Sequence, residues 1–241
     1  MKIFLDTVET IEEGLGFSHY DGTHFAWLIG ILMVVVVCCI WYRKMDDKQK
    51  GIWKKTVAVL LLADELFKVV MLIVGGRYLP DYLPLHLCSI NIFMIAIHAW
   101  KPSRLLSNFL YTVCIPGALA ALLFPTWTSL PVLNFMHLHS FTVHLLLILY
   151  PIVLTVCGEL NPTARSIPRC LLFLAGMAVI ALGVNLILDT NFMFLMYAEE
   201  GNPLYIFEQL WGSHLLGFPV LITAVLLVMY LPLELWRKFK K

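Results

Sequence analysis

The sequence predicts an all-α fold, a polytopic membrane protein built as a bundle of seven transmembrane helices. Hydrophobic residues make up 60% and charged residues 14% of the 241 residues, and the mean hydropathy is +0.83. Soluble domains carry about 25% charged residues, so most of this chain is expected to lie in lipid. Apolar runs recur near the roughly 20 residues that a membrane-crossing helix needs, and basic residues collect in alternate loops.

The seven expected spans follow one another along the chain, separated mostly by short connections. They are His24–Tyr42, Thr56–Val74, Pro84–Trp100, Asn108–Phe124, His137–Cys157, Cys170–Leu188 and Ser213–Trp236. Turn signals stand in three of the connections, at Gly75-Gly76, Lys101-Pro102 and Asn161-Pro162. Residues 24–241 are therefore expected to form one transmembrane domain.

The basic residues predict the orientation of the bundle. They crowd the first, third and fifth loops and the C-terminal tail, as Arg43, Lys44, Lys48, Lys50, Lys54, Lys55, Lys101, Arg104, Arg165, Arg169, Arg237, Lys238, Lys240 and Lys241. The opposite side keeps only Lys2 and Arg77. By the positive-inside rule the N-terminus lies outside and the C-terminus lies in the cytoplasm. The formal net charge of +1 gives no indication of a nucleic-acid partner.

Two segments outside the spans are expected at the outer surface. In residues 1–23, apolar side chains recur at helical spacing between acidic ones, which favours an amphipathic surface helix over a frayed tail. The long stretch from Asp189 to Gly212 suits an interfacial segment or a lid. It mixes aromatic and acidic residues, namely Phe192, Phe194, Tyr197, Tyr205, Phe207, Trp211, Glu199, Glu200 and Glu208.

Three charged residues lie inside the second expected span. Asp64, Glu65 and Lys68 would each cost roughly 3 kcal/mol in the middle of a bilayer, so they are expected to face a polar interior. Lys68 is three residues from Glu65 and four from Asp64, so an alternative is mutual neutralisation along one helix.

Other polar residues are expected to converge with these charges in the outer half of the membrane. His86 stands near the outer end of the third span, and Asn91 lies about 10 Å deeper at 1.5 Å per residue. His144 is seven residues inside the fifth span, and Asn185 approaches the outer end of the sixth. These residues predict a pocket reached from outside or from the outer leaflet, with Glu65 at its floor.

Structural roles are open for several of the same residues. His86 could bond a helix end, and His137, Ser140 and His144 share a helix face on which histidine and serine could simply connect helices or could carry out proton transfer. The six cysteines form no CxxC pair and lie in or at the edges of spans. They predict neither a disulfide framework nor a metal site.

Several motifs resemble the YwaF-like family of bacterial integral membrane proteins. They are LPLHLCSIN from Leu83 to Asn91, PGALAALLFP from Pro116 to Pro125, VNLIL from Val184 and TNFMFL from Thr190, with His144 seven residues before Pro151. His24 and Glu65 also fit the pattern of that family. The resemblance implies a multi-pass protein of the bacterial plasma membrane, and it adds His24 and Asn191 to the candidate binding residues Glu65, Asn91 and Asn185.

The chain also resembles, more distantly, the eukaryotic transmembrane protein one-six-four family, acyltransferases that build polyunsaturated ether phospholipids. Pro84 and His86 match the ends of that family's Pro-Cys-His motif, and His144 with Pro151 matches a later motif. Leu85 stands where the family has its nucleophilic cysteine. Cys88 lies three residues later, which by helical spacing places it on a neighbouring face.

Two classes of function follow. The first is an intramembrane acyltransferase for glycerophospholipids, in which His144 or His86 is the general base, the other His or an Asn stabilises the oxyanion, and Glu65 orients an imidazole. Transfer is either direct or covalent, and a covalent route would need Cys88, Ser89 or Ser140 as nucleophile. Its partners would be membrane lipids, an acyl donor and an acceptor lipid, with no cofactor, metal or nucleic acid. The second is a seven-helix protein that binds or transports a lipid or small molecule through its buried charges.

Overall fold

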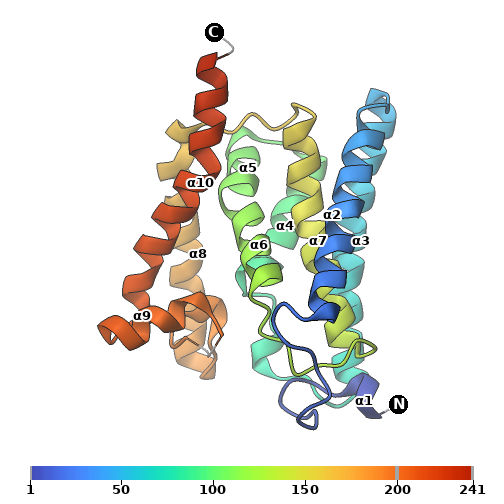
Figure 1. Ribbon diagram of the computed structural model, residues 1–241, viewed down its shortest axis with the longest axis vertical. Coiled ribbons are helices and arrows are strands. Elements are labelled where there is room, and N and C mark those ends of the chain that lie inside the picture. The colour runs from blue at the N-terminus through green and yellow to red at the C-terminus, as the bar shows by residue number, and fades with distance from the viewer. Residues whose placement is uncertain (1, 199–200, 240–241) are drawn as a thin grey trace.

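The computed structural model describes residues 2–198 and 201–239, and every regular element within them is helical (Figure 1). The elements are α1 (Lys2–Leu5), α2 (Gly22–Tyr42), α3 (Asp47–Val74), η1 (Pro80–Tyr82), α4 (Leu87–Trp100), α5 (Arg104–Phe109), η2 (Leu110–Cys114), α6 (Ile115–Leu123), α7 (Phe135–Val156), η3 (Ala164–Ser166), α8 (Ile167–Leu188), η4 (Phe192–Phe194), α9 (Pro203–Trp211), η5 (His214–Leu216) and α10 (Gly217–Phe239). The all-α prediction is confirmed.

Within the described residues, six helical segments are long and apolar enough to cross a membrane. They are Gly22–Tyr42, Pro80–Trp100, Arg104–Leu123, Phe135–Val156, Ala164–Leu188 and His214–Leu235. Each overlaps a span expected from the sequence and differs from it by a few residues at its ends. The remaining expected span lies in α3, which is 28 residues long and carries too many charges to count among the six by composition.

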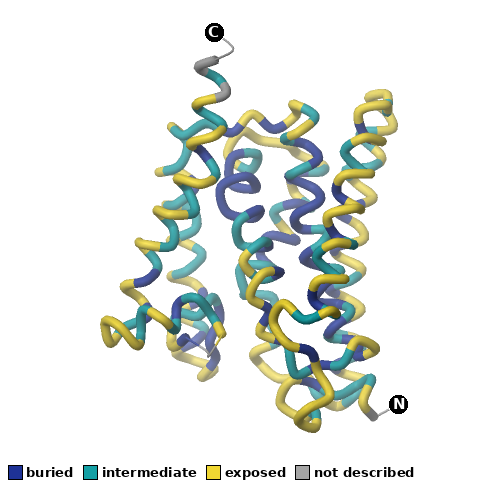
Figure 2. The backbone as a smooth tube through the Cα atoms, viewed as in Figure 1, coloured by how far each residue is buried: buried dark blue, intermediate teal, exposed yellow. Residues whose placement is uncertain are grey.

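The α7 helix is the centre of the bundle. It packs against α2, α3, α4 and α6. In the most apolar 18-residue stretch of α7, 67% of the residues are buried, compared with 11% in the corresponding stretches of the spans that contain α8 and α10. Figure 2 shows the same contrast, with buried backbone along α5 to α7 and exposed backbone along α8 and α10. Polar side chains on α7 therefore face protein.

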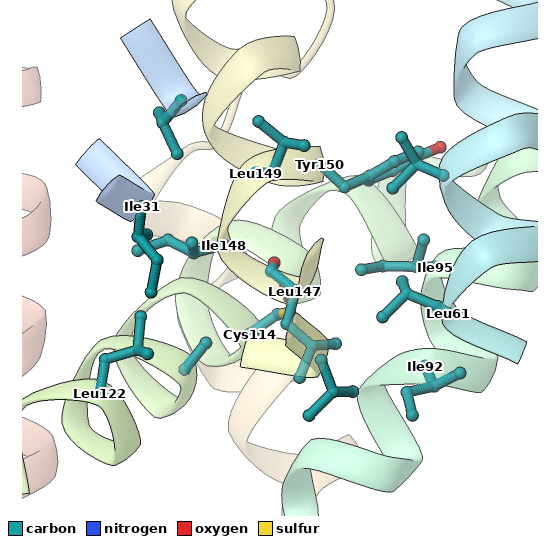
Figure 3. Packing of buried hydrophobic residues seen from close by; sticks show 14 of the residues in the cluster. Ile31, Leu61, Ile92, Ile95, Cys114, Leu122, Leu147, Ile148, Leu149 and Tyr150 are labelled. Atoms are coloured by element: carbon teal, nitrogen blue, oxygen red, sulfur yellow. Dashed lines mark hydrogen bonds between the residues drawn. The ribbon is translucent and has the colours of Figure 1, made fainter. Parts of the chain in front are cut away.

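A proline in α7 leaves a backbone acceptor that a neighbouring helix uses. Pro151 has no N–H to donate to the carbonyl of Leu147, four residues earlier. The thiol of Cys114 donates to that oxygen at 3.4 Å, and the two residues lie side by side in the core (Figure 3). A proline also accompanies the π-helical turn η2 (Leu110–Cys114), since Pro116 cannot donate to the carbonyl of Thr112.

The N-terminal segment corrects one expectation. Helix α1 covers only Lys2–Leu5, and turns follow instead of an amphipathic helix through residue 15. The reason is tertiary: the side chain of Asn134 donates to the carbonyls of Ile3 and Asp6, and the N–H of Phe17 donates to the carbonyl of Thr128 at 2.8 Å. The segment is held against the α6–α7 loop by these backbone contacts.

The two chain termini lie at opposite ends of the bundle (Figure 1). We call the end near α1 the N-terminal end and the other the C-terminal end. The α2–α3 and α7–α8 connections, which carry Arg43 and Arg165, lie at the C-terminal end. The basic loops are thus on one side, while their cytoplasmic location stays a prediction. Lys240 and Lys241 of the basic tail lie outside the described residues, as do Glu199 and Glu200 of the expected lid.

Candidate functional site

Cys88 and His144 meet in the half of the bundle near the N-terminal end. Cys88 is the second residue of α4, which begins only after the turn η1 and an extended His86. Its Sγ lies 3.0 Å from Nε2 of His144 on α7. Leu85 precedes the helix, so the helical-spacing argument that placed Cys88 relative to position 85 does not apply. The structure joins two residues that the sequence analysis had as separate candidates.

A backbone carbonyl fixes the protonation of the imidazole. Nδ1 of His144 lies 2.6 Å from the carbonyl oxygen of Ser140. A carbonyl oxygen can only accept a hydrogen bond, so Nδ1 carries the proton. In the neutral ring, Nε2 is then a bare acceptor that faces the thiol of Cys88. This is the arrangement of a nucleophile and its general base. We call Cys88 and His144 the dyad.

The indole of Trp127 covers one face of this imidazole. The two rings are stacked with centroids 5.3 Å apart and planes 12° apart. Trp127 comes from the α6–α7 loop and also meets Phe141 edge-on at 5.4 Å. Sequence analysis did not single out Trp127, because a loop aromatic carries no periodic signal.

A cluster of charges lies beside the dyad at the α3–α7 interface. Lys68 Nζ donates to Glu65 Oε1 at 2.6 Å, and His139 Nδ1 lies 3.3 Å from Asp64 Oδ1. Thr142 donates to the other oxygen of Asp64 at 2.9 Å. The charges therefore face a protein interior, as the sequence predicted, and Glu65 and Lys68 also neutralise each other along α3. His139 was missed, although it is on the same helix as His144.

One of the buried polar atoms without a hydrogen bond lies at the dyad, since Trp127 stacks on His144. In the described residues, six buried side-chain atoms form no hydrogen bond: Asn91 Oδ1, Trp127 Nε1, Ser129 Oγ, His139 Nδ1, Glu208 Oε2 and His214 Nε2. His139 Nδ1 is close to Asp64, but not at hydrogen-bond geometry. Asn91 lies three residues after Cys88 on α4, so the two share a helix face. Because buried polar groups are normally paired, the free indole N–H of Trp127 and the free amide oxygen of Asn91 are available to a ligand.

The side chains of three predicted binding residues form hydrogen bonds to the protein's own backbone. His24 bonds the carbonyl of Leu122 through Nε2 and accepts from the N–H of Tyr20. Asn185 bonds both the N–H and the carbonyl of Phe192, and Asn191 bonds the backbone of Met196 and Tyr197. The two asparagines shape the α8–α9 loop.

His86 faces that loop. Its ring meets Phe192 edge-on at 5.1 Å, with Phe194 at 6.2 Å. Met193 and Phe194 have positive φ values of 59° and 54°, which are unfavourable for residues other than glycine. His137 bonds Trp27 and the carbonyl of Leu130, so both of its ring nitrogens have hydrogen-bond partners within the protein. Of the predicted catalytic residues, the structure brings His144 and Cys88 into contact and directs His86 toward the loop.

Comparison with known proteins gives a family. The sequence pattern of the TMEM164 family matches residues 16–230, which include all of α2 to α9. No curated protein and no solved structure matches the chain.

Proposed function

Since this chain belongs to the TMEM164 family, we propose that it is an intramembrane acyltransferase for glycerophospholipids, with Cys88 as nucleophile and His144 as general base. The observation that carries the proposal is the 3.0 Å contact between Cys88 Sγ and the bare Nε2 of His144. The distant resemblance noted in the sequence supplies the reaction class.

The proposed setting is a seven-crossing bundle in the bacterial plasma membrane. Helix α3 would be the seventh crossing, since it packs against α4 and α7 and hides Glu65 and Lys68 between them. With the N-terminus outside, the dyad lies in the outer half of the bilayer. Acyl donor and acceptor lipids would then reach it from that leaflet.

The first half-reaction transfers an acyl group to sulfur. His144 Nε2 takes the proton of the thiol while Sγ bonds to the ester carbonyl carbon, and the carbonyl electron pair moves onto oxygen. When the carbonyl reforms, the carbon–oxygen bond to the lysolipid breaks. That leaving oxygen takes the proton from His144. A thioester on Cys88 and a free lysolipid result.

The second half-reaction returns the acyl group to a lipid. The hydroxyl of the acceptor lipid attacks the thioester carbonyl and gives its proton to His144. Collapse of the oxyanion expels the sulfur of Cys88, which takes the proton back. The dyad is restored, and atoms and charges balance over the cycle.

The geometry favours this covalent route over direct attack by an acceptor hydroxyl. Nε2, the basic nitrogen of His144, is already in contact with sulfur, so an incoming hydroxyl would have to displace Cys88 to reach it. In apolar surroundings a neutral thiol–imidazole pair costs less than two buried charges. Proton transfer therefore accompanies the attack. Asn91, with its unsatisfied amide oxygen, is the proposed polar contact for the lipid.

Binding or transport is the second candidate, and the buried charge cluster is the observation that favours it. Asp64, Glu65, Lys68 and His139 carry a net negative charge when His139 is neutral, which is costly to bury. A protein that holds a cationic or polar solute there would need no thiol. The two candidates therefore differ in whether Cys88 matters.

Reconstituted protein tests the proposal directly. Liposomes would contain a phospholipid with an isotope-labelled acyl chain and a lysophospholipid acceptor, and mass spectrometry would follow the labelled chain. We expect transfer with the native protein, a hydroxylamine-sensitive acyl adduct on Cys88, and neither with Cys88→Ala. The matched control is Cys114→Ala, because Cys114 is also buried but bonds only a backbone carbonyl.

The outcomes separate the routes. Transfer that persists in Cys88→Ala would rule out the thioester and leave direct transfer by His144. If no labelled chain moves with the native protein across a broad set of donors and acceptors, the acyltransferase proposal fails and binding or transport is the better reading.

A further inference from the structure

Trp127 is the least explained residue at the dyad. Its ring lies flat on His144 at 5.3 Å between centroids, and it is only 8% exposed. Its Nε1 forms no hydrogen bond within the part of the chain that the structure describes. Stacking needs only the faces of the indole, so a phenyl ring could provide it. The buried N–H is an additional feature that the packing does not require.

An unpaired buried N–H is unfavourable. A buried donor without an acceptor has lost its hydrogen bonds to water without replacing them, and buried indole N–H groups usually find a partner. Trp27 shows the usual case in the same protein, since its Nε1 donates to His137 Nε2 at 2.9 Å. Among the described residues the N–H of Trp127 has no acceptor, so an acceptor that arrives with the substrate would remove the penalty.

We propose that the Nε1–H of Trp127 donates to the oxyanion that forms when Cys88 attacks an ester carbonyl. The proposal rests on the acyltransferase function above and assigns a catalytic role to a residue outside the dyad. The negative charge develops on the carbonyl oxygen, next to the carbon that bonds Sγ. Trp127 stacks on His144, and Nε2 of His144 lies 3.0 Å from Sγ, so the indole is next to the imidazole that contacts the nucleophile.

The start of α4 supplies the second donor. The first N–H groups of a helix have no partner within it, and Cys88 is the second residue of this 14-residue helix. The first backbone bond to the α4 cap is made by Ile90, to the carbonyl of His86. The N–H of Cys88 is thus available, and its helix terminus favours negative charge. Two donors of this kind are the usual composition of an oxyanion hole.

Substitution of the indole nitrogen tests the role of Trp127. Benzothienylalanine at position 127 keeps the shape and stacking but replaces N–H with sulfur. Removing one oxyanion donor lowers kcat about 100- to 1,000-fold, and we expect that loss with little change in KM. Benzothienylalanine at position 27 is the matched control, because Trp27 stacks on Phe141 at 4.6 Å and 2° but is not at the dyad.

A spectroscopic readout makes the test independent of turnover. A long-chain alkyl trifluoromethyl ketone forms a hemithioketal with Cys88, whose oxyanion mimics the intermediate. In protein with 15N-labelled tryptophan, the indole N–H resonance of Trp127 should move downfield on adding this probe, while that of Trp27 stays. Cys88→Ala should abolish the change.

Each result has one meaning. Unchanged kcat in the Trp127 analogue, or an adduct on Cys88 without a shift at Trp127, overturns the oxyanion role and leaves the thiol mechanism intact. If the native protein neither transfers acyl chains nor forms the adduct, the proposed function fails and takes this role with it. A large loss of kcat together with the shift supports it.

Discussion

Two polar networks in the same bundle differ in how completely their atoms are hydrogen-bonded. At the C-terminal end, His98 bonds Tyr150 at 2.9 Å and Ser107 at 3.0 Å through its two ring nitrogens, and Glu159 accepts from Tyr42 and Lys54. Near the N-terminal end, both ring nitrogens of His144 also have partners, a carbonyl and a thiol, but the N–H of the Trp127 indole stacked on it has none among the described residues. All six unsatisfied buried atoms found in the described residues lie outside the first network.

The difference separates residues that hold the fold from residues available for chemistry. A complete network stabilises one arrangement and has nothing left to offer a ligand. An incomplete one sacrifices stability, which a protein tolerates where a substrate supplies the missing partners. Burial alone does not distinguish them, because His98 and His144 are 5% and 6% exposed.

The largest expected effect is the loss of activity in His144→Ala. Removing a general base lowers the rate about 100- to 10,000-fold. His144→Ala also loses two hydrogen bonds and a stacking contact, so we expect activity per folded molecule to fall far more than stability. Acyl transfer in liposomes and thermal unfolding in detergent would be measured on the same preparation. Retained transfer would place the base elsewhere.

At His98 we expect the reverse, a loss of stability without a loss of activity. His98→Ala leaves the hydroxyl of Tyr150, which is fully buried, without its partner. An unsatisfied buried group costs about 1–3 kcal/mol, so stability should fall while activity per folded molecule is kept. Tyr150→Phe removes the other partner, and the double variant should lose less than the sum of the two. Additive losses would show that the pair is not coupled.

Gly16 connects the N-terminal segment with the loop that carries Trp127. A Cβ on residue 16 would lie 1.9 Å from the carbonyl oxygen of Thr128, which forces the backbone apart. We expect Gly16→Ala to lower stability by about 1–3 kcal/mol, as overpacking does, and to reduce activity because Trp127 shifts. Gly14→Ala is a comparison without such a clash, although its φ of 83° adds backbone strain. Normal stability in Gly16→Ala would contradict the close approach.

The smallest effect concerns acid pH at the C-terminal end. Partial burial raises the pKa of Glu159, but hydrogen bonds from Lys54 and Tyr42 outweigh it and hold the pKa below its ordinary value. A lowered pKa in the folded state means that ionised Glu159 stabilises the fold above its ordinary pKa. That contribution is lost as the pH falls through the folded pKa.

Solvent screening keeps this contribution small, since the side chains of Lys54 and Glu159 are 25% and 29% exposed. About 0.2–1 kcal/mol is expected for such a pair. Unfolding followed from pH 7 to pH 3 should show a shallower decline for Glu159→Gln than for the native chain. Parallel curves would show that Glu159 does not contribute to the acid sensitivity.

Polar residues inside apolar helices gave the clearest signal in the sequence. His144, Asn91 and Glu65 were singled out because such a residue is conspicuous there. Asn185 and Asn191 were equally conspicuous, but they bond the α8–α9 loop, and hydropathy does not tell a ligand contact from a backbone contact. Trp127 gave no signal, since aromatic residues are common in membrane-protein loops.

The sequence by itself determined the helical class, the approximate bounds of the apolar helices and the segregation of the basic loops, because these depend on local composition and on the thickness of a bilayer. Only the tertiary structure decided that Cys88 faces His144. That contact joins residues 56 positions apart, and it depends on α4 starting at Leu87, after the extended His86. No periodicity encodes such a start, because it results from how α3, α4 and α7 pack together.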